Sequence, residues 1–414
     1  MLNLNKPMSG QKIQALKGFR DFGPVEAKKR AWLKNQMVTV FESWGYLPIE
    51  TPTLEPLELF AGQIGEDEKL FYKFVDNGGR EVALRYDQTV PTCRFIGNNY
   101  NSLTFPFKRY QIQNVLRAEK PQAGRYREFT QVDIDLVGNK NPEADAEIIA
   151  MSIKLYQKLG FTNVKAVINS RKMIKDIPYE AIVAIDKLKK IGVEGVIAEM
   201  IKKGISKTLA EGYLQQIKEL TPDADLKIIF EYLKGCGISE DNFVFEPTLA
   251  RSFSYSDGPI WEIIVPEYST GSVGGGERYD GLMNRISGFD LGATGIAFGF
   301  DRTLEAMEQL KLLPVFEATT QVLVTTFSPD LFEASLKLAL RLRQGGINCE
   351  TYPDPFAKLE KQLRYADKKQ ISFAAILGPD EVKNNTVTLK NLATKGQQTV
   401  ERSVIPDLIG NPDR

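Results

Sequence analysis

The chain of 414 residues contains no histidine. Imidazole is the usual general base near neutral pH, so this absence excludes Ser-His-Asp and Cys-His nucleophiles and histidine-ligated zinc hydrolases. No charge of one sign dominates either, because 53 Lys and Arg balance 53 Asp and Glu. Any nucleic acid must therefore be bound by a local basic cluster and not by the field of the whole molecule.

Cysteine is scarce and scattered. Cys93, Cys236 and Cys349 form no CxxC pair, which excludes a cysteine zinc cage and a disulfide framework and predicts reduced thiols. No apolar run reaches the ~18 residues of a membrane span, and the first residues lack an apolar leader core. We therefore expect a cytoplasmic protein that does not enter a membrane.

The length and the 43% apolar composition predict two or three globular domains. Residues 26–45 carry apolar side chains at the spacing of an amphipathic helix, from Leu33 to Trp44. Strand patterns follow with few helices between them, and this succession predicts an antiparallel sheet. The expected strands cover residues 46–54, 70–74, 82–86, 107–116 and 128–137.

A helical pattern over 143–160 and 179–234 predicts a helical insertion at about 170–238 within a first domain, 1–317. Strands return at 261–265, and GATGIAFGFDRTLEAM has the pattern of a strand, a tight turn and a helix. Beyond Pro314 strands and helices alternate, which predicts a separate α/β domain over 318–404 and a tail at 405–414.

The densest polar cluster runs from Lys108 to Asp135. Two strand-like segments flank a loop with Arg117 at its entry, and guanidinium groups at such a loop could clamp a phosphate. A solvated hairpin with ion pairs explains the loop equally well. Gln131, Asp133 and Asp135 favour a site, because their period-two spacing puts all three side chains on one face of a strand.

Other candidate motifs are weaker by themselves. Asp87 and Thr89 are expected on one strand face as acceptors for an ammonium group, and Arg251 precedes an aromatic turn. GSVGGGERYDG, from residue 271, lacks the strand-loop-helix context of a dinucleotide site, so its glycines more plausibly let backbone approach a ligand. There is no GxxxxGK[ST] loop, and FGFDR ends with a further cation, Arg302.

Five strings occur in the order that one family shows. They are GFRDF at Gly18, a helix followed by Pro52, the segment from Arg117 to Asp135, LARSFSYSDG, and FGFDR ending at Arg302. Together, over about residues 12–400, they resemble the histidyl-tRNA synthetases, which are class II aminoacyl-tRNA synthetases. Class I synthetases are disfavoured independently, because their HIGH signature needs histidines.

The resemblance implies an α+β catalytic domain on the class II antiparallel sheet (1–317), a helical insertion, and a C-terminal α/β anticodon-binding domain (318–404). It also implies that L-histidine condenses with ATP, accompanied by Mg²⁺, to histidyl-adenylate, and that histidine then moves to the 3′ end of tRNA(His). The substrate carboxylate attacks phosphorus, so arginines can supply positioning and charge without imidazole. No zinc, flavin or nicotinamide is expected. A homodimer is implied, with the first helix and the strand near Pro52 at its interface.

Three arginines are the catalytic residues that the resemblance implies. Arg117 matches the arginine that bridges the α-phosphate and the amino acid carboxylate, Arg251 matches a second α-phosphate contact, and Arg302 matches a γ-phosphate contact. Glu119 resembles the acid on the adenine side of ATP.

The histidine-binding residues follow from the same motifs. The groups expected to hold the α-ammonium are Asp87, Thr89 and Gln131. Asp135 is expected to face the imidazole and accept a ring N–H. Where the family usually has RGLDYYTG, Tyr255 is retained, but the second tyrosine, whose hydroxyl completes the imidazole pocket, is Ser256.

The shorter Ser256 side chain predicts either a water that bridges it to the ring or a substitute donor from elsewhere. A Ser256→Tyr variant that binds histidine much more tightly would support the water. Glu277 replaces a glycine of the family's GGGRYDG string, with no consequence that the sequence reveals.

Contacts to tRNA are expected from Lys120, Gln122 and Arg125 at the acceptor end. A basic helix over 358–369 either contacts the anticodon stem or is a solvated charged face, and both interpretations stay open. Its cations are Lys358, Lys361, Arg364, Lys368 and Lys369.

The alternative function is that of a non-catalytic regulatory subunit of ATP phosphoribosyltransferase, a paralogue of this family. Such regulators typically lack the anticodon domain or have lost phosphate-binding arginines. This chain retains Arg117, Arg251 and Arg302, and only the altered Tyr255-Ser256 pair favours the regulator.

Overall fold

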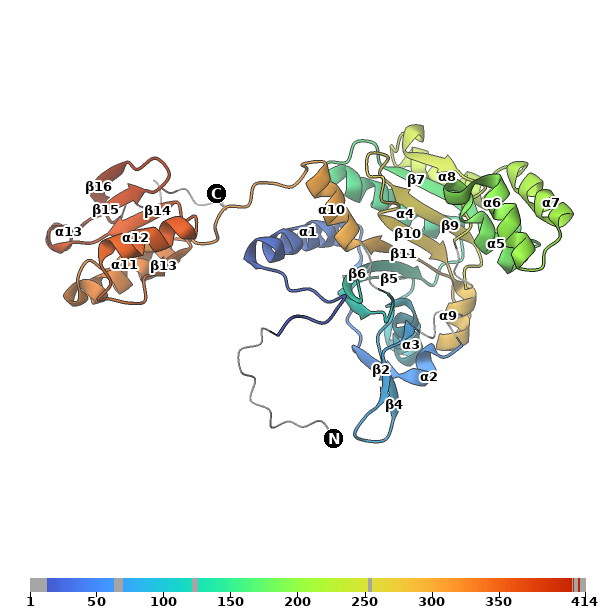
Figure 1. Cartoon of the computed structure of the whole chain (residues 1–414), viewed down its shortest axis with the longest axis horizontal. Coiled ribbons are helices and arrows are strands. Elements are labelled where there is room, and N and C mark those ends of the chain that lie inside the picture. The colour runs from blue at the N-terminus through green and yellow to red at the C-terminus, as the bar shows by residue number, and fades with distance from the viewer. Residues whose placement is uncertain are drawn as a thin grey trace. The chain divides into compact units, whose positions relative to one another are not determined.

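The computed structural model describes residues 13–62, 70–120, 126–251, 255–403, 405 and 409. The chain divides into two compact units, 1–313 and 314–414 (Figure 1). The sequence pattern placed this boundary at 317/318. Among the described residues no helix is both long and apolar enough to cross a membrane.

An eight-stranded sheet forms the centre of the first unit. Its six central strands are antiparallel neighbours, whereas β1 joins β5 and β8 joins β7 in parallel, so the predicted antiparallel sheet is confirmed with parallel edges. The strands lie in the order β1 (Leu47–Pro48), β5 (Phe107–Leu116), β6 (Glu128–Val137), β11 (Ala293–Gly299), β10 (Gly274–Arg278), β9 (Pro259–Ile264), β7 (Lys165–Ser170) and β8 (Phe243–Phe245).

Helices cover one face of this sheet. Their apolar side chains and those of the strands form the main core, in which Trp261 is fully buried and Phe41 stacks on Phe298. The apolar stripe from Leu33 to Phe41 thus packs on the chain's own sheet. The helices are α1 (Pro24–Ser43), α4 (Pro142–Lys158), α8 (Ala224–Gly235) and α10 (Phe300–Gln309).

The predicted helical insertion has a core of its own. That core is built by α5 (Tyr179–Ile185), α6 (Leu188–Lys202) and α7 (Lys207–Lys218), together with Ile174, Ile177 and Ala250. The fourth helix of the segment, α8, instead buries Leu226, Ile229 and Leu233 in the main core.

The segment before β5 is more helical than its sequence pattern indicates. It holds α2 (Leu57–Phe60), α3 (Thr89–Asn99) and a small sheet of β2 (Leu54–Pro56), β4 (Glu81–Leu84) and β3 (Lys73–Val75). The prediction that Asp87 and Thr89 share a strand face is wrong: Asp87 lies after β4, and Thr89 begins α3. Pro91 suits a first helical turn, where no N–H is needed, and the Asp87 carboxylate accepts from the Val90 N–H at 3.3 Å.

The C-terminal unit is α/β, as predicted. Its sheet has the order β13 (Cys349–Thr351), β12 (Val322–Val324), β14 (Phe373–Ile376), β15 (Thr386–Asn391) and β16 (Gln397–Glu401), with the first three strands parallel. The helices are α11 (Phe332–Gln344), α12 (Leu359–Lys368) and α13 (Pro379–Lys383). The hairpin of β15 and β16 was not predicted. The expected loose tail is partly wrong, because Ile405 is buried in this unit's core, where apolar burial holds it.

Candidate active site

The face of the sheet opposite the helices carries a cavity of about 350 Å³. All three predicted catalytic arginines, Arg117, Arg251 and Arg302, line it. Eight further residues singled out from the sequence also line it: Asp87, Thr89, Glu119, Gln131, Asp133, Asp135, Tyr255 and Glu277.

Strand register sets the order of the side chains in this cavity. Asp135 lies opposite Gly295, which in turn lies opposite Glu277, so these residues form one row across β6, β11 and β10. The next row on the same face holds Asp133, Ala297 and Gly275. Directly opposite residues in an antiparallel sheet project to the same side, so each row presents its side chains to the cavity.

The cavity floor requires residues without bulk. A Cβ atom at Gly295 would lie 2.0 Å from Asp135 Oδ1, and one at Gly275 would lie 1.7 Å from Arg251 Nη1. Real side chains do not approach so closely, so any larger residue would push the carboxylate or the guanidinium aside. Gly275 of the glycine-rich string therefore makes room for the Arg251 guanidinium, whereas the close approach of its backbone to a ligand stays a prediction.

Aromatic rings hold Arg117 in place. Its guanidinium lies 4.5 Å from the centroid of the Tyr86 ring and 5.2 Å from that of Phe129, and its Nε donates to the Tyr86 carbonyl at 3.2 Å. Cation–π contacts of this kind orient a guanidinium while leaving donors for an anion.

Hydrogen bonds that involve backbone groups hold Arg302 and Arg251 in place. Arg302 stands in the first turn of α10 and donates to the Ser272 carbonyl at 3.0 Å. Arg251 has a left-handed backbone, φ 41°, and its N–H donates to Asp186 at 3.1 Å. Such a conformation costs a non-glycine residue on the order of 1 kcal/mol, which the surrounding contacts must offset.

Buried carboxylates gather at the other side of the cavity. Burial raises the pKa of Asp87 to about 6, against the lowering effect of Arg117, and raises the pKa of Asp133 to about 7. Gln131 donates to Asp133 at 2.7 Å. Asp133 Oδ1 and Gln131 Oε1 are buried acceptors without a hydrogen-bond partner among the described residues, so a cationic donor in the cavity would satisfy them.

Asp135 is held from two sides. Arg109, which is fully buried, forms an ion pair with it, and the Tyr279 hydroxyl donates to its Oδ1. Burial raises the pKa of Asp135, whereas the charge of Arg109 lowers it. Neither Arg109 nor Tyr279 was singled out from the sequence, because their pairing depends on strand register.

Ser256 and Glu277, the two departures from the family pattern, meet in space. The Ser256 hydroxyl donates to the Glu277 carboxylate, and Ser256 is not among the residues that line the cavity, whereas Glu277 is. Glu277 Oε1 also lies 3.7 Å from Arg251 Nη2.

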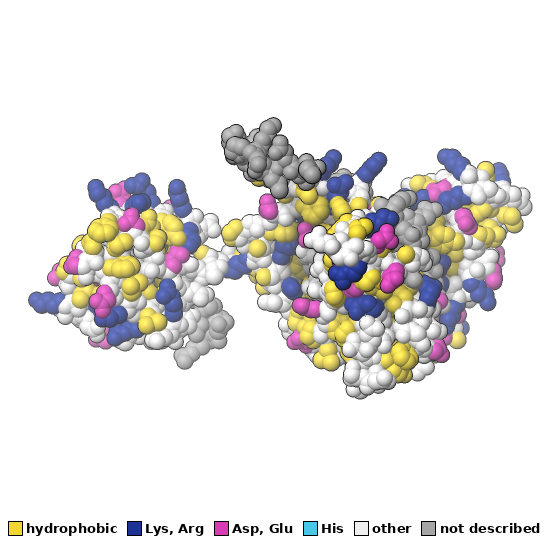
Figure 2. Space-filling model, turned by 90° about the horizontal axis from the view of Figure 1, so that it is seen from below, with side chains coloured by type: hydrophobic (Ala, Val, Ile, Leu, Met, Phe, Trp, Pro, Cys, Tyr) yellow, Lys and Arg dark blue, Asp and Glu magenta, His cyan; other side chains and the backbone are white. Residues whose placement is uncertain are grey.

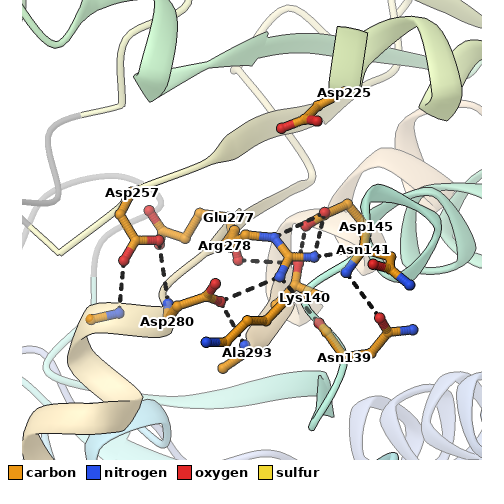
Figure 3. Close-up of polar contacts among 12 residues, drawn as sticks. Asn139, Lys140, Asn141, Asp145, Asp225, Asp257, Glu277, Arg278, Asp280 and Ala293 are labelled. Atoms are coloured by element: carbon orange, nitrogen blue, oxygen red, sulfur yellow. Dashed lines mark hydrogen bonds and ion pairs between the residues drawn. The ribbon is translucent and has the colours of Figure 1, made fainter. Parts of the chain in front are cut away.

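A buried network on the other side of β10 fixes the strand that carries Glu277. Arg278 points away from the cavity toward Asp145, and its Nη2 donates to Asp145 at 2.6 Å (Figure 3). Further donors of Arg278 reach the Asn139 and Asn141 carbonyls at 3.1 and 3.0 Å. Since successive side chains alternate in a strand, anchoring Arg278 also orients Glu277.

Of the three residues predicted to contact tRNA, Lys120 alone lies among the described residues. Lys120 is exposed and does not line the cavity, and Gln122 and Arg125 lie outside the described residues. Sequence reasoning placed Asp133 beside Gln131 and Asp135 on one strand face, from their period-two spacing, but gave it no role. It did not assign Glu277 to a site.

A helix-backed antiparallel sheet whose open face carries arginines above glycines, followed by an α/β unit, is the arrangement of a class II aminoacyl-tRNA synthetase. A family model described as Histidyl-tRNA synthetase matches residues 18–191, and one described as Anticodon binding domain matches 321–411. The histidine–tRNA ligase of Cytophaga hutchinsonii is 36% identical, covering 92% of this chain and 96% of its own, and that of Helicobacter pylori strain 26695 is 35% identical, covering 92% and 93%. The chain belongs to the histidyl-tRNA synthetase family.

Solved structures show the same fold over nearly the whole chain. The histidyl-tRNA synthetase of Nostoc sp. PCC 7120 superposes with a TM-score of 0.82 at 27% identity, covering 96% of this chain and 99% of that one. A structure from Bacillus halodurans, described as an ATP phosphoribosyltransferase regulatory subunit/histidyl-tRNA synthetase, has a TM-score of 0.70 at 22% identity, covering 90% and 100%. The latter likeness shows the fold alone.

Proposed function

We propose that this chain is a cytoplasmic, homodimeric histidine–tRNA ligase that activates L-histidine with ATP and transfers it to tRNA(His). This proposal rests on the order of the charged side chains along the cavity. Asp135 and Glu277 lie in the row of Gly295. The next row holds Asp133 at one end and Arg251 over Gly275 at the other, and Arg302 comes just after Gly299, the last residue of β11. A cationic amino acid at one end and a triphosphate at the other fit this order.

The proposed chemistry assigns each group a task. The histidine carboxylate attacks the α-phosphorus, the bond to the β-phosphate oxygen breaks, and pyrophosphate leaves. Arg117 and Arg251 stabilise the charge that develops on the α-phosphate, and Arg302 holds the γ-phosphate. Asp87, Thr89 and Gln131 hold the α-ammonium, and Glu119 holds the adenine.

Mg²⁺ enters this reaction as a companion of ATP. The described residues contain no group of three or more Cys, Asp or Glu side chains placed to hold a metal ion, so the ion would be carried by the phosphates of the substrate. Its chemistry is to neutralise phosphate charge, beside the arginines.

Exposed apolar side chains support the homodimer. Leu47 is 59% and Val75 is 62% exposed, and Leu54 and Phe74 of the small sheet are also exposed. Leu47 and Leu54 flank Pro52, in the strand region that the resemblance places at the subunit interface, and Phe74 and Val75 belong to the same small sheet as Leu54. Sedimentation velocity should give the dimer mass, and a Val75→Asp variant should sediment as a monomer.

The regulatory alternative predicts that no amino acid is activated. Exchange of pyrophosphate into ATP, measured with each of the twenty amino acids, should occur with histidine alone. Arg302→Ala should lower this exchange at least 100-fold, chiefly by raising KM for ATP. Absence of exchange with every amino acid would favour the regulator.

A further inference from the structure

Glu277 stands two strands away from Asp135, with a glycine between them. Asp135, Gly295 and Glu277 occupy directly opposed positions on β6, β11 and β10, and Gly295 has no side chain. The Asp135 and Glu277 side chains therefore project to the same side of the sheet, from backbones about 10 Å apart, which is two interstrand spacings. Both residues line the cavity, and Glu277 is only 7% exposed.

An imidazole ring has the chemistry to join these two carboxylates. A ring with an N–H on each nitrogen spans roughly 8 Å from one acceptor oxygen to the other, counting two hydrogen bonds of about 2.8 Å and the ring itself. Asp135 Oδ1 itself stands over Gly295, 2.0 Å from where a Cβ atom would lie, so the ring would lie between this oxygen and Glu277.

The partners of Glu277 define its role as an acceptor. Its Oε2 accepts from the Ser256 hydroxyl, and its Oε1 faces Arg251 at 3.7 Å. On the opposite side, Asp135 is likewise held by donors, namely Arg109 and Tyr279. Neither carboxylate can donate to an imine nitrogen, so a neutral imidazole would leave one ring nitrogen facing an acceptor.

We propose that Glu277 is a specificity-determining residue that, with Asp135, selects histidine in its imidazolium form. This inference rests on the proposed function of the cavity. Both ring nitrogens donate, one to each carboxylate, so the bound ring carries a proton that free histidine has mostly lost above its pKa of about 6.5. Glu277 is thus an acceptor for the ring, where the sequence predicted a bridging water or a substitute donor.

Glu277 could instead serve only to position Arg251, and the test separates the two roles. Glu262 is the matched control, because its Oε1 lies 3.8 Å from Arg251 Nη1 and it does not line the cavity. We would compare wild type, Glu277→Gln and Glu262→Gln, each verified as folded by circular dichroism. The readout is KM for histidine in pyrophosphate exchange from pH 6.5 to 8.5.

In the wild type, KM for histidine should rise several-fold per pH unit, because the imidazolium fraction falls up to tenfold per unit above the ring pKa. Glu277→Gln should remove this rise, since its amide can donate to a neutral ring, whereas Glu262→Gln should retain it. Calorimetry at pH 8 in buffers of different ionisation enthalpy should show uptake of close to one proton per histidine bound, lost in Glu277→Gln.

A flat KM profile in the wild type, or a Glu277→Gln profile parallel to the wild type with only kcat lowered, would overturn the proposal and leave Glu277 a positioning residue for Arg251. Either result with histidine-dependent exchange present leaves the enzyme function intact. Absence of exchange with any amino acid would instead reject the proposed function itself.

Discussion

Buried acids whose charge is only partly compensated make the ligand-free site costly to ionise. Asp133 is 3% exposed, and Arg109, whose charge lowers the pKa of Asp133, is ion-paired with Asp135. The raised pKa values of Asp87 and Asp133, about 6 and 7, follow from this burial. An ammonium ligand would offset the cost of ionising Asp87 and Asp133. The two residues that lower the stability of the ligand-free protein would therefore contribute to the affinity for the ligand.

These pKa values predict how stability depends on pH. Because they are raised above the unfolded value of about 3.9, the folded state binds the protons more tightly. The free energy of unfolding of the ligand-free protein should therefore decrease as pH rises from about 4 to about 7, by about 1.4 kcal/mol per unit of pKa shift. Asp133→Asn should flatten this dependence in urea unfolding. An unchanged slope would show that Asp133 does not titrate in this range.

Ser256 and Glu277 should respond to substitution as a pair. A tyrosine at 256 would need the space into which the Glu277 carboxylate projects, so Ser256→Tyr alone should lower histidine-dependent exchange at least tenfold. Adding Glu277→Gly should restore most of it, a coupling that a double-mutant cycle measures. A single Ser256→Tyr variant that binds histidine more tightly than the wild type would instead indicate room beside Glu277 and a bridging water in the natural pocket.

At the scale of elements, the sheet places the site and the glycines keep it open. The predicted bounds of β5 and β6, 107–116 and 128–137, agree with the structure, because the alternation of apolar and polar residues, clearest over 131–136, identifies a strand. α3 escaped prediction because its short pattern, TVPTCRFIGNN, contains a proline and β-branched residues that also suit a strand edge. The apolar side of α3 packs in one cluster with Phe107 of β5 and Val137 of β6, and Thr89 at its start lines the cavity.

Gly295→Ala tests the contribution of the floor. The new methyl group would meet Asp135 Oδ1 at 2.0 Å, so the carboxylate must move. We expect exchange to fall at least 100-fold and the protein to lose about 1–3 kcal/mol of stability. Gly212→Ala is the control: this helical glycine in α7 has open space around it, and alanine should stabilise by about 0.5–1 kcal/mol. Normal exchange in Gly295→Ala would mean that activity does not depend on the position of the Asp135 carboxylate over this glycine.

At the scale of the whole molecule, the second unit has mixed charge on the face that Figure 2 shows. Lys and Arg side chains stand there among Asp and Glu. Within and beside α12, Arg364 pairs with Glu360 at 2.9 Å and Lys369 with Glu350 at 2.7 Å. Exposed ion pairs of this kind contribute little to stability and are typical of a charged surface in solvent. The interpretation of α12 as a solvated face therefore stays open beside that of a tRNA contact.

Salt dependence distinguishes the two interpretations of this helix. If Lys358 and Lys368 contact tRNA phosphates, each change to alanine should reduce the slope of log affinity against log salt by about one and leave pyrophosphate exchange unchanged. Lys337→Ala on α11, whose lysine pairs with Glu333 at 2.6 Å, serves as the control and should keep the full slope. Equal slopes in all variants would assign α12 to the solvated face.

The sequence by itself determined the class of chemistry, because the absence of histidine and the positions of three arginines depend on composition and local order alone. It also determined the alternation that builds β5, β6 and the C-terminal α/β unit. Tertiary structure decided what faces what: that Glu277 meets Ser256 and opposes Asp135, and that Arg109 and Tyr279 hold that carboxylate. The physical reason is that strand register and the placement of loops join residues from 21 to 144 positions apart, through contacts that no local pattern encodes.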